Sequence, residues 1–305
     1  MKIAVSSSSE VSLPVLDFLV NNKNYELQLV ITNPDKATGR GRLVVPNAVS
    51  SWCAEKKIAV VKPVDNQELV AIFDREKVDL LITVAYGHIL KEEILSKPRF
   101  GAINLHYSLL PKYRGAAPVQ HAILNGDQIS GVTVFKLDQG MDSGPIYIQK
   151  ELEIEQAETT QHLIGRLNMI GVDLVGQTLQ MISKGIAPVP QSELNITFAP
   201  KFSKADGEIN WQNSAEDIFN QYRALGNNPG VFTSHSGVKI KISEMSKLSS
   251  KTLAPGAFSV VSESLAVGTN STDLMINSLT PEGRKVMTGK DFFNGLQEKV
   301  QKSFA

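Results

Sequence analysis

The chain has 305 residues, a formal net charge of zero and 42% hydrophobic residues, values typical of a soluble globular protein of about two domains. No run of about 18 apolar residues occurs, so no membrane span is predicted, and the N-terminus lacks the apolar core of a secretory signal. Cys53 is the only cysteine, which excludes an internal disulfide and makes the reducing cytoplasm the expected location.

The first part of the chain alternates strand-like and helix-like segments. Short apolar runs predict strands, and apolar residues at helical spacing predict the helices between them. The expected strands cover residues 2–5, 26–32, 58–61, 78–85 and 101–108, and the expected helices cover residues 11–22, 46–57 and 66–77. This alternation implies a mainly parallel sheet with right-handed crossovers. Residues 1–185 are therefore predicted to form a Rossmann-like α/β domain.

The end of this domain and the second part have a different pattern. Residues 131–137 and 145–154 predict an antiparallel pair, and residues 159–185 predict one long amphipathic helix. Residues 186–206 contain prolines without a clear period and are predicted to be a linker. Short strands with Gly and Ser turns then predict a small OB-like β-barrel over residues 207–305, with one helix at 215–225.

Two polar residues interrupt the apolar strand predicted at 101–108. Asn104 and His106 are two positions apart, so both project from one face of the strand near its carboxyl end. Ligands on parallel α/β sheets bind beyond the carboxyl ends of the strands. One interpretation is that the two side chains are hydrogen-bonded structural groups, because burying either without a partner costs roughly 1–3 kcal/mol. The other is that they belong to a functional site.

Two loops can complete such a site. The loop SLLPKYRG follows the strand directly and offers the donors of Arg114, and the turn LDQGMDSGPI brings Asp142. A carboxylate beside an imidazole raises its affinity for a proton and fixes its orientation, and Asn104 can donate to a developing oxyanion. This set favours direct acyl transfer to an amine. Ser108 as a serine-hydrolase nucleophile is the competing interpretation, and it lacks the G-x-S-x-G elbow.

The two motifs together resemble one family. N-x-H-x-S-L-L-P-x-x-R-G at residues 104–115, followed by L-D-x-G-M-D-[ST]-G at 137–144, is similar to the folate-dependent formyltransferases. Over nearly its full length the chain resembles the branch of that family that acts on methionyl-tRNA. The segments that carry this likeness are TNPDKATGRGR, AYGHIL, GEINW, RALGNNPGVF and EGRKVMTGKDFFNG. The chain departs from the family's first loop, roughly GT-x-x-FA, where Ser6–Ser9 stand.

The resemblance implies transfer of a formyl group from 10-formyltetrahydrofolate to the α-amino group of initiator methionyl-tRNA, for translation initiation. Asn104 and protonated His106 would stabilise the tetrahedral oxyanion, His106 would pass the amine proton to N10 of the folate, and Asp142 would orient His106. The residues implied in folate binding are Ser108, Leu109, Leu110, Pro111, Tyr86, Gly87, Ile89 and Leu90. No metal is expected, because no H-x-x-x-H or Cys–His cluster occurs, and a monomer is expected.

Basic residues are expected to contact the tRNA. The loop at 33–45 carries three cations and one carboxylate, Asp35, and the resemblance implies that it wedges into the acceptor end, with binding that weakens in salt. The residues predicted to contact tRNA are Lys36, Arg40, Arg42, Lys204, Lys239 and Lys241. A charge-rich segment can also be ordinary solvated surface. In the second part of the chain, acidic residues nearly cancel the basic ones, so tRNA binding there requires the basic residues to lie on one side. His121, His162 and His235 are expected to be ordinary surface or helix residues.

Other functions fit parts of the sequence. A formyltransferase acting on a nucleotide-linked amino sugar shares the N-x-H motif but generally lacks the PD-x-x-x-GRG loop, and a formyltetrahydrofolate hydrolase would release formate instead. A nicotinamide-dependent dehydrogenase needs G-x-G-x-x-G after the first strand, where SSSSEVS has no glycine. A noncatalytic RNA-binding protein built from a sheet and a barrel would have no need for Asn104, His106 and Asp142 together.

Overall fold

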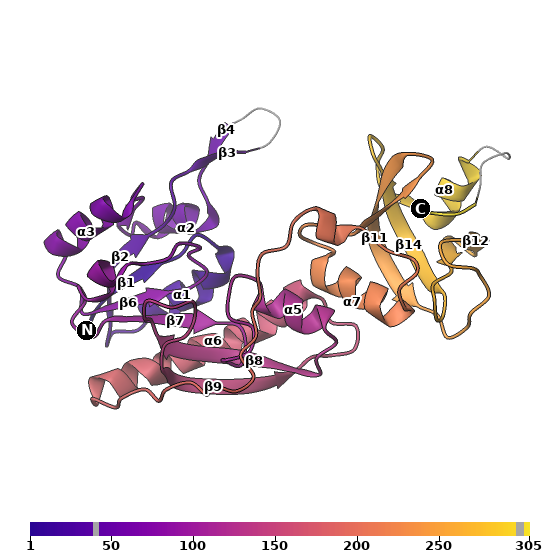
Figure 1. Ribbon diagram of the computed structural model, residues 1–305. Helices are drawn as coiled ribbons and strands as arrows, with labels where there is room; N and C mark the ends of the chain where they lie inside the picture. Colours follow the sequence, from indigo (N-terminus) through magenta and orange to yellow (C-terminus); the bar gives the residue numbers. More distant parts are fainter. Residues whose placement is uncertain (39–42, 297–301) are drawn as a thin grey trace. The chain divides into compact units, whose positions relative to one another are not determined.

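The computed structural model describes residues 1–38, 43–296 and 302–305 of the chain. These residues form two compact units (Figure 1). The first unit comprises residues 1–118, 129–153 and 164–200, and the second comprises 119–128, 154–163 and 201–305. The units are therefore interleaved along the chain.

The first unit contains a seven-stranded sheet in the order β5-β2-β1-β6-β7-β8-β9. The first five strands in this order are parallel, and β7, β8 and β9 pair antiparallel, so the predicted mainly parallel sheet and its late antiparallel pair are confirmed. The strands are β1 Lys2–Ser6, β2 Glu26–Ile31, β5 Val60–Val61, β6 Leu80–Thr83, β7 Ala102–His106, β8 Ile129–Lys136 and β9 Ile146–Glu153.

Helices connect the parallel strands at or near the predicted positions. They are α1 Leu13–Asn21, α2 Ala48–Lys56, α3 Asn66–Arg75 and α4 Glu92–Leu95, with a 3₁₀ turn at Glu10–Ser12 before α1. The long helix α6 Thr160–Ser183 follows β9. Side-chain caps set the starts of α2 and α3, where Asn47 accepts from the Ser50 amide and Asp65 from the Glu68 amide, both at 2.9 Å. Among the described residues, none of the helices is long and apolar enough to cross a bilayer.

The sheet of the first unit is covered on both faces. On one face, Ala4 and Leu81 of the sheet pack with Phe73 of α3 and Ile94 of α4 in a buried apolar cluster. Helices α1 and α6 pack on the other face, where glycines of α6 approach Phe18 of α1 and a leucine of β7. Strands buried on both sides have to be apolar along their length, which explains the fully buried β6.

The segment expected to be a linker is bonded to the first unit as far as Pro200. Val189 forms two backbone hydrogen bonds with Ile146 at the start of β9, of 2.7 and 2.8 Å. Further along, Ala199 is fully buried, and its amide donates to the Arg114 carbonyl at 2.7 Å. This stretch therefore has fixed neighbours on two sides, although its sequence has no strand or helix period.

A two-stranded hairpin, β3 Lys36–Thr38 and β4 Leu43–Val45, follows β2 in the first unit (Figure 1). Its base is fixed by polar contacts. Lys62 Nζ lies 2.6 and 2.7 Å from the two carboxylate oxygens of Asp35, and Asn33 donates its side-chain amide to the Tyr86 carbonyl at 3.4 Å. Asp35, the one acidic residue in the sequence of the loop 33–45, is thus paired with a lysine from outside that loop.

The second unit is built on a curled antiparallel sheet in the order β10-β11-β14-β13-β12, with β15 paired to β14. Short strands are found in this part, as predicted, and an isolated bridge joins Glu208 to Phe232. The elements are α5 Pro118–Leu124, α7 Ala215–Leu225, β10 Phe232–His235, β11 Val238–Lys247, β12 Phe258–Val261, β13 Ser264–Val267, β14 Leu274–Pro281, β15 Met287–Thr288 and α8 Gly289–Asn294.

The core of the second unit corrects the expectation for His235. This residue is 6% exposed on β10, and its ring centroid lies 5.6 to 6.2 Å from those of Phe258, Phe292 and Phe304. Strand alternation explains the burial, because Thr233 and His235 share the inward face of β10. His235 is therefore a core residue and not a surface one.

Candidate active site

Strand β7 presents Asn104 and His106 on one face. Leu105 points the other way, because a Cβ added to Gly171 of α6 would lie only 3.0 Å from the Leu105 side chain. Tyr107 points the same way as Leu105, and its hydroxyl donates to a side chain of α6. Asn104 and His106, which alternate with these two residues, therefore face away from α6, as the period-two pattern predicts.

A threonine on the neighbouring strand orients the amide of Asn104. Thr83 of β6 is opposite Asn104 in the parallel register, and its hydroxyl donates to Asn104 Oδ1 at 2.7 Å. Because the oxygen already accepts this bond, the two N–H groups of the amide point to other partners. Asn104 can therefore donate to a substrate oxygen. The predicted site does not include Thr83, although its pairing with Asn104 follows from aligning the two strands at their carboxyl ends.

His106 is 5% exposed, and each of its ring nitrogens lies near an oxygen atom. Nε2 lies 2.9 Å from the Tyr113 carbonyl, and Nδ1 lies 3.8 Å from Asp142 Oδ2. A carbonyl only accepts, so Nε2 carries the hydrogen in this arrangement. The Nδ1 distance is too long for a direct hydrogen bond but short enough for a strong charge interaction. In the neutral ring, Nδ1 therefore carries the lone pair that can take a proton.

Asp142 reaches His106 from the turn between β8 and β9. Its Oδ2 atom also accepts from the Gly115 amide at 2.7 Å, so one carboxylate contacts both the imidazole and the loop after β7. Gly115 has φ +125°, and a Cβ there would lie 2.7 Å from the Ala199 carbonyl oxygen. Gly144 has no room either, because its Cβ would lie 1.8 Å from the Lys136 carbonyl oxygen. Glycine at 115 thus permits the close approach of Ala199 to the loop after β7, and glycine at 144 permits the turn to fold back on the end of β8.

The surroundings of His106 favour the neutral imidazole. Burial lowers the pKa of His106, while the negative charge of Asp142 and the bond to the Tyr113 carbonyl raise it in part. The net direction is downward from the ordinary histidine pKa. At neutral pH the ring is therefore a base, and the carboxylate of Asp142 is placed to stabilise the imidazolium that forms when Nδ1 takes a proton.

The loop predicted to hold folate is ordered by its own hydrogen bonds. The Ser108 hydroxyl donates its hydrogen to the Lys112 carbonyl at 2.6 Å and not to His106, so Ser108 is not arranged as a nucleophile. Leu110 is buried, and its amide donates to Thr133 Oγ1 at 3.2 Å. Leu109 packs against Gly131, and Pro111 is partly exposed.

The second predicted folate segment divides its side chains between core and solvent. Tyr86 and Leu90 belong to the buried cluster under α3 and α4, whereas Ile89 is 76% exposed. Gly87 has φ +79°, and nothing lies within 4 Å of the position that a Cβ would take there, so its backbone is open on that side. A ligand at this turn would meet backbone groups and Ile89 rather than the phenol of Tyr86.

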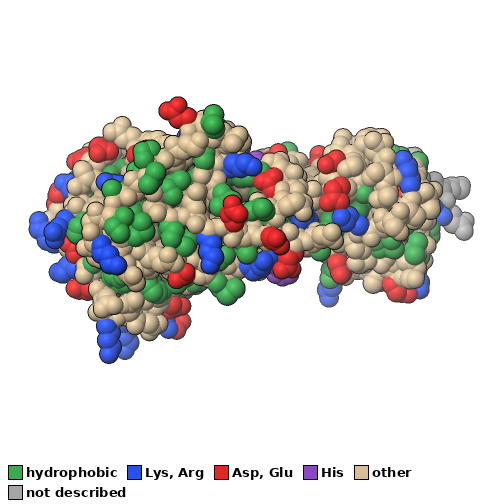
Figure 2. All heavy atoms as spheres, turned by 90° about the horizontal axis from the view of Figure 1, so that it is seen from below, with side chains coloured by type: hydrophobic (Ala, Val, Ile, Leu, Met, Phe, Trp, Pro, Cys, Tyr) green, Lys and Arg blue, Asp and Glu red, His purple; other side chains and the backbone are tan. Residues whose placement is uncertain are grey.

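The predicted tRNA-binding residues fall in different parts of the chain. Lys36 lies in β3, and Arg40 and Arg42 lie outside the described residues. Lys204 is exposed in the second unit, and Lys239 and Lys241 alternate along β11 with the buried residues Ile240 and Ile242. These two lysines therefore share the outer face of β11. Charges of both signs are scattered over each unit on the face drawn in Figure 2.

Two other cations of the second unit are engaged elsewhere. Arg223 is 6% exposed and donates to the Glu158 carbonyl at 3.1 Å, so it is part of the core and not available to a nucleic acid. Lys247 Nζ lies 2.8 Å from Glu216 Oε2 in an ion pair. Lys239 Nζ lies 3.2 Å from the centroid of the Phe232 ring, a contact that leaves its charge uncompensated.

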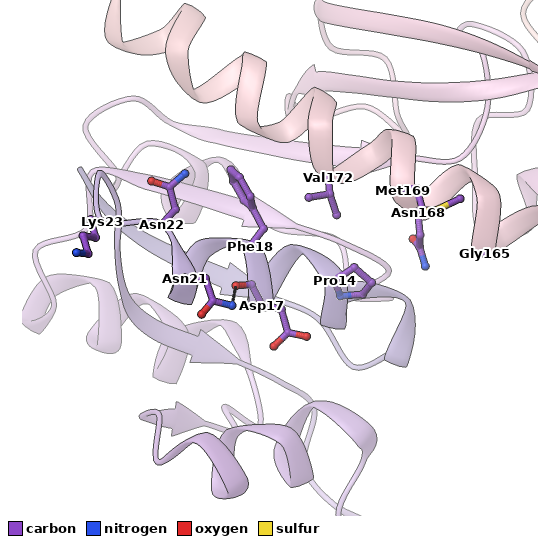
Figure 3. Close-up of a pocket in the computed structure, with 10 residues that line it drawn as sticks. All are labelled: Pro14, Asp17, Phe18, Asn21, Asn22, Lys23, Gly165, Asn168, Met169 and Val172. Atoms are coloured by element: carbon purple, nitrogen blue, oxygen red, sulfur yellow. Dashed lines mark hydrogen bonds between the residues drawn. The ribbon is translucent and has the colours of Figure 1, made fainter.

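A groove of about 890 Å³ lies on the opposite side of the sheet, between α1 and α6 (Figure 3). Phe18 of α1 and Val172 and Met169 of α6 give it apolar walls, and Asp17, Asn21 and Asn168 add polar groups. It is wide open to solvent, and its lining contains none of the predicted site residues. The catalytic candidates therefore lie at strand ends and in loops, and not in this groove.

Comparisons with known proteins agree with the motifs. A family described as formyl transferase matches residues 1–179, and one described as formyl transferase, C-terminal domain, matches residues 201–297. The methionyl-tRNA formyltransferase of Caldicellulosiruptor saccharolyticus is 35% identical, covering 98% of both chains, and that of Thermodesulfovibrio yellowstonii is 38% identical, covering 94% of this chain and 93% of its own. An N-formyltransferase from Helicobacter canadensis, solved with folinic acid and dTDP-3-aminofucose, shares the fold with a TM-score of 0.68 at 19% identity, over 90% of this chain and 98% of that one.

Proposed function

The chain belongs to the formyl transferase family, and on that premise we propose that it transfers a formyl group from 10-formyltetrahydrofolate to the α-amino group of methionyl-tRNA. The observation that carries the proposal is the meeting of His106 and Asp142 at the carboxyl end of β7, two residues after an amide held by Thr83. Relatives of the same length that carry the methionyl-tRNA formyltransferase name support the choice of acceptor.

The reaction uses the three side chains in sequence. The neutral amine attacks the formyl carbon, and the Asn104 amide donates to the oxyanion that develops. Nδ1 of His106 takes the proton that the attacking nitrogen loses, and the resulting imidazolium, held beside Asp142, stabilises the oxyanion in turn. The new carbon–nitrogen bond is kept when the bond to N10 breaks, and His106 returns its proton to N10. No covalent intermediate with the enzyme is required.

The folate would lie along two segments of the first unit. Residues 108–111 have their polar groups tied to Thr133 and Lys112, so they form a fixed wall. The turn at 86–90 offers open backbone at Gly87 and the exposed side chain of Ile89. Both segments follow strands whose carboxyl ends meet at the same edge of the sheet, where ligands of parallel α/β sheets bind.

We propose that the tRNA contacts the basic residues in both units. Asp35 is neutralised by Lys62, so the charges of Lys36, Arg40 and Arg42 have no acidic residue of their own loop to offset them. In the second unit, Lys239 and Lys241 share the outer face of β11, and Lys204 is exposed. Phosphate contacts of this kind position an RNA without reading its sequence.

Replacing Arg42 with alanine is expected to raise KM for methionyl-tRNA by about tenfold and to leave KM for the folate within about twofold, because one phosphate contact is lost. The slope of log affinity against log salt should also decrease by about one. Initial rates at several salt concentrations measure both effects. Lys77→Ala, which removes an exposed charge elsewhere in the first unit, is the control and should change neither constant. Equal increases in the two KM values would argue against a tRNA contact.

A comparison of acceptors tests the proposed function. Purified protein is supplied with 10-formyltetrahydrofolate and either charged initiator tRNA or a nucleotide-linked amino sugar, and kcat/KM is measured for each. We expect methionyl-tRNA to be favoured by at least about a hundredfold, on the order of what buried contacts to a cognate substrate provide. Preference for the amino sugar would replace this acceptor with the one bound in the Helicobacter canadensis enzyme.

A further inference from the structure

Gln191 connects the two loops that hold the catalytic candidates. It lies after α6 in the segment 186–200 and is partly buried. Its side-chain oxygen accepts from Arg114 Nη2 at 2.7 Å, and its side-chain nitrogen donates to the carbonyls of Asp142 and Gly144, both at 2.8 Å. One amide thus bonds to the loop after β7 and to the turn that carries Asp142.

We propose that Gln191 is a positioning residue for formyl transfer, which holds the Asp142 turn against the loop of Arg114 so that the carboxylate stays beside His106. The proposal rests on the proposed function, since it assigns Gln191 a role in that same reaction. Gln191 touches neither His106 nor any reacting atom, so its effect on the reaction has to pass through Asp142 and Arg114.

The backbone on either side of Gln191 is anchored to the same two loops. Before it, Val189 exchanges two hydrogen bonds with Ile146, just after the Asp142 turn. After it, the Thr197 carbonyl accepts from the Arg114 amide at 2.9 Å, and Ala199 pairs with the same loop. Gln191 is therefore held between the two loops by main-chain bonds, and its side chain has little freedom to choose other partners.

The chemistry of these contacts requires an amide. The Arg114 guanidinium needs an acceptor, and the two carbonyls need donors, so the group between them must offer both. A carboxylate would keep the contact with Arg114 but would place an oxygen opposite the two carbonyl oxygens. Arg114 Nε is buried without a hydrogen-bond partner, so the Nη2 contact with Gln191 is important for the position of this guanidinium.

The position of Asp142 depends on these bonds in two ways. Asp142 has φ +49°, a left-handed conformation that is uncommon for non-glycine residues, although aspartate adopts it more readily than most. Its carboxylate must also stay within reach of both Gly115 and His106. Loss of the donors to the Asp142 and Gly144 carbonyls would let the turn relax away from both partners.

Two substitutions separate this role from simple packing. Gln191→Met keeps the length of the side chain and loses all three bonds, whereas Gln191→Glu keeps the Arg114 bond and loses the two donations to the turn. Glu193→Gln is the control, since Glu193 is exposed in the same segment. For each protein, kcat, the two KM values, the melting temperature and the exchange rate of the Gly115 amide proton are measured. The exchange rate reports the bond from Gly115 to Asp142 without any substrate.

Both Gln191 variants are expected to lose about 10- to 100-fold in kcat, because small misplacements of a catalytic group have effects of this size. KM for the folate and the melting temperature should stay close to the parent values, Gly115 exchange should become faster, and Glu193→Gln should behave as the parent. Parental kcat in Gln191→Glu, or a lower melting temperature with unchanged kcat and unchanged exchange, would overturn the proposal. A parent protein that transfers no formyl group in the same assay would instead reject the proposed function.

Discussion

Replacing His106 with glutamine is expected to lower kcat for formyl transfer by about 10³-fold, the size of a general acid–base contribution. In the proposed mechanism, His106 takes the amine proton at Nδ1, and no other side chain has this role. The glutamine amide keeps a donor for the Tyr113 carbonyl, which His106 Nε2 contacts at 2.9 Å, so the loop should stay in place. Single-turnover rates with saturating folate and tRNA measure the loss.

The fold and the donor site serve as controls for this variant. The melting temperature and the dissociation constant for a folate analogue should change little, because His106 is proposed to act on the amine and not to hold the folate. His106→Ala is the second variant, and it should be equally inactive although it also leaves a cavity. Turnover within about tenfold of the parent in both variants would remove His106 from the mechanism.

Replacing Asp142 with asparagine is expected to lower kcat by on the order of 10²-fold, because the imidazolium that forms during transfer loses its counter-charge. Asparagine keeps an oxygen for the Gly115 amide, which donates to Asp142 at 2.7 Å, so the turn retains this contact. Asp142→Ala removes the contact as well and should lose at least as much activity. Unchanged kcat in the asparagine variant, with a normal melting temperature, would mean that the carboxylate charge plays no part.

The same variant should move the titration of His106. Burial lowers the pKa of His106 and the Asp142 charge raises it, so removing the charge should lower the pKa further. A two-dimensional NMR titration of the imidazole is expected to give a midpoint below the free value of about 6.5 in the parent and a still lower one in Asp142→Asn. Because the unfolded chain binds this proton more readily, the contribution of His106 to stability is lost as the pH falls from about 6.5 through the folded pKa. A higher midpoint in the variant would contradict the assigned interaction.

Local periodicity predicts the part of the site that lies on one strand. The alternation in NLHYS places Asn104 and His106 on one face and Leu105 on the other, and the structure has this arrangement. The apolar runs before and after it predict β6 and the antiparallel pair β8–β9 for the same reason. In each case the pattern of side chains repeats over a few residues, so neighbours in sequence carry the information.

Contacts between distant segments are harder to predict. The glycine-rich turn and the family likeness indicate Asp142 near His106, whereas neither indicates Thr83 or the Tyr113 carbonyl. Thr83 has a usable signal, because the carboxyl ends of adjacent parallel strands are level. The contact with the Tyr113 carbonyl has no such signal, because every residue carries a backbone carbonyl and the residue type therefore does not reveal which one is used.

The segment 186–200 shows why irregular chain is difficult to interpret from sequence. Its prolines and missing period predict a linker, yet Gln191 and Ala199 are bonded to two loops of the first unit. These contacts involve single residues at irregular spacing, so they leave no helical or strand periodicity in the sequence from which they could be predicted. The expectation for His235 is wrong for another reason, because its place on the inner face of β10 depends on strand alternation that the sequence does contain.

In the proposed reaction, this chain moves a formyl group from folate directly to the amine of methionyl-tRNA. The most direct measurement follows a ¹³C label in the formyl group of 10-formyltetrahydrofolate through a single turnover with charged initiator tRNA. We predict that the label is recovered on the methionine nitrogen, in an amount equal to the tetrahydrofolate formed, and that His106→Gln abolishes this recovery. Label released as formate, or left on the folate while the parent protein is folded and both substrates are bound, would contradict the claim.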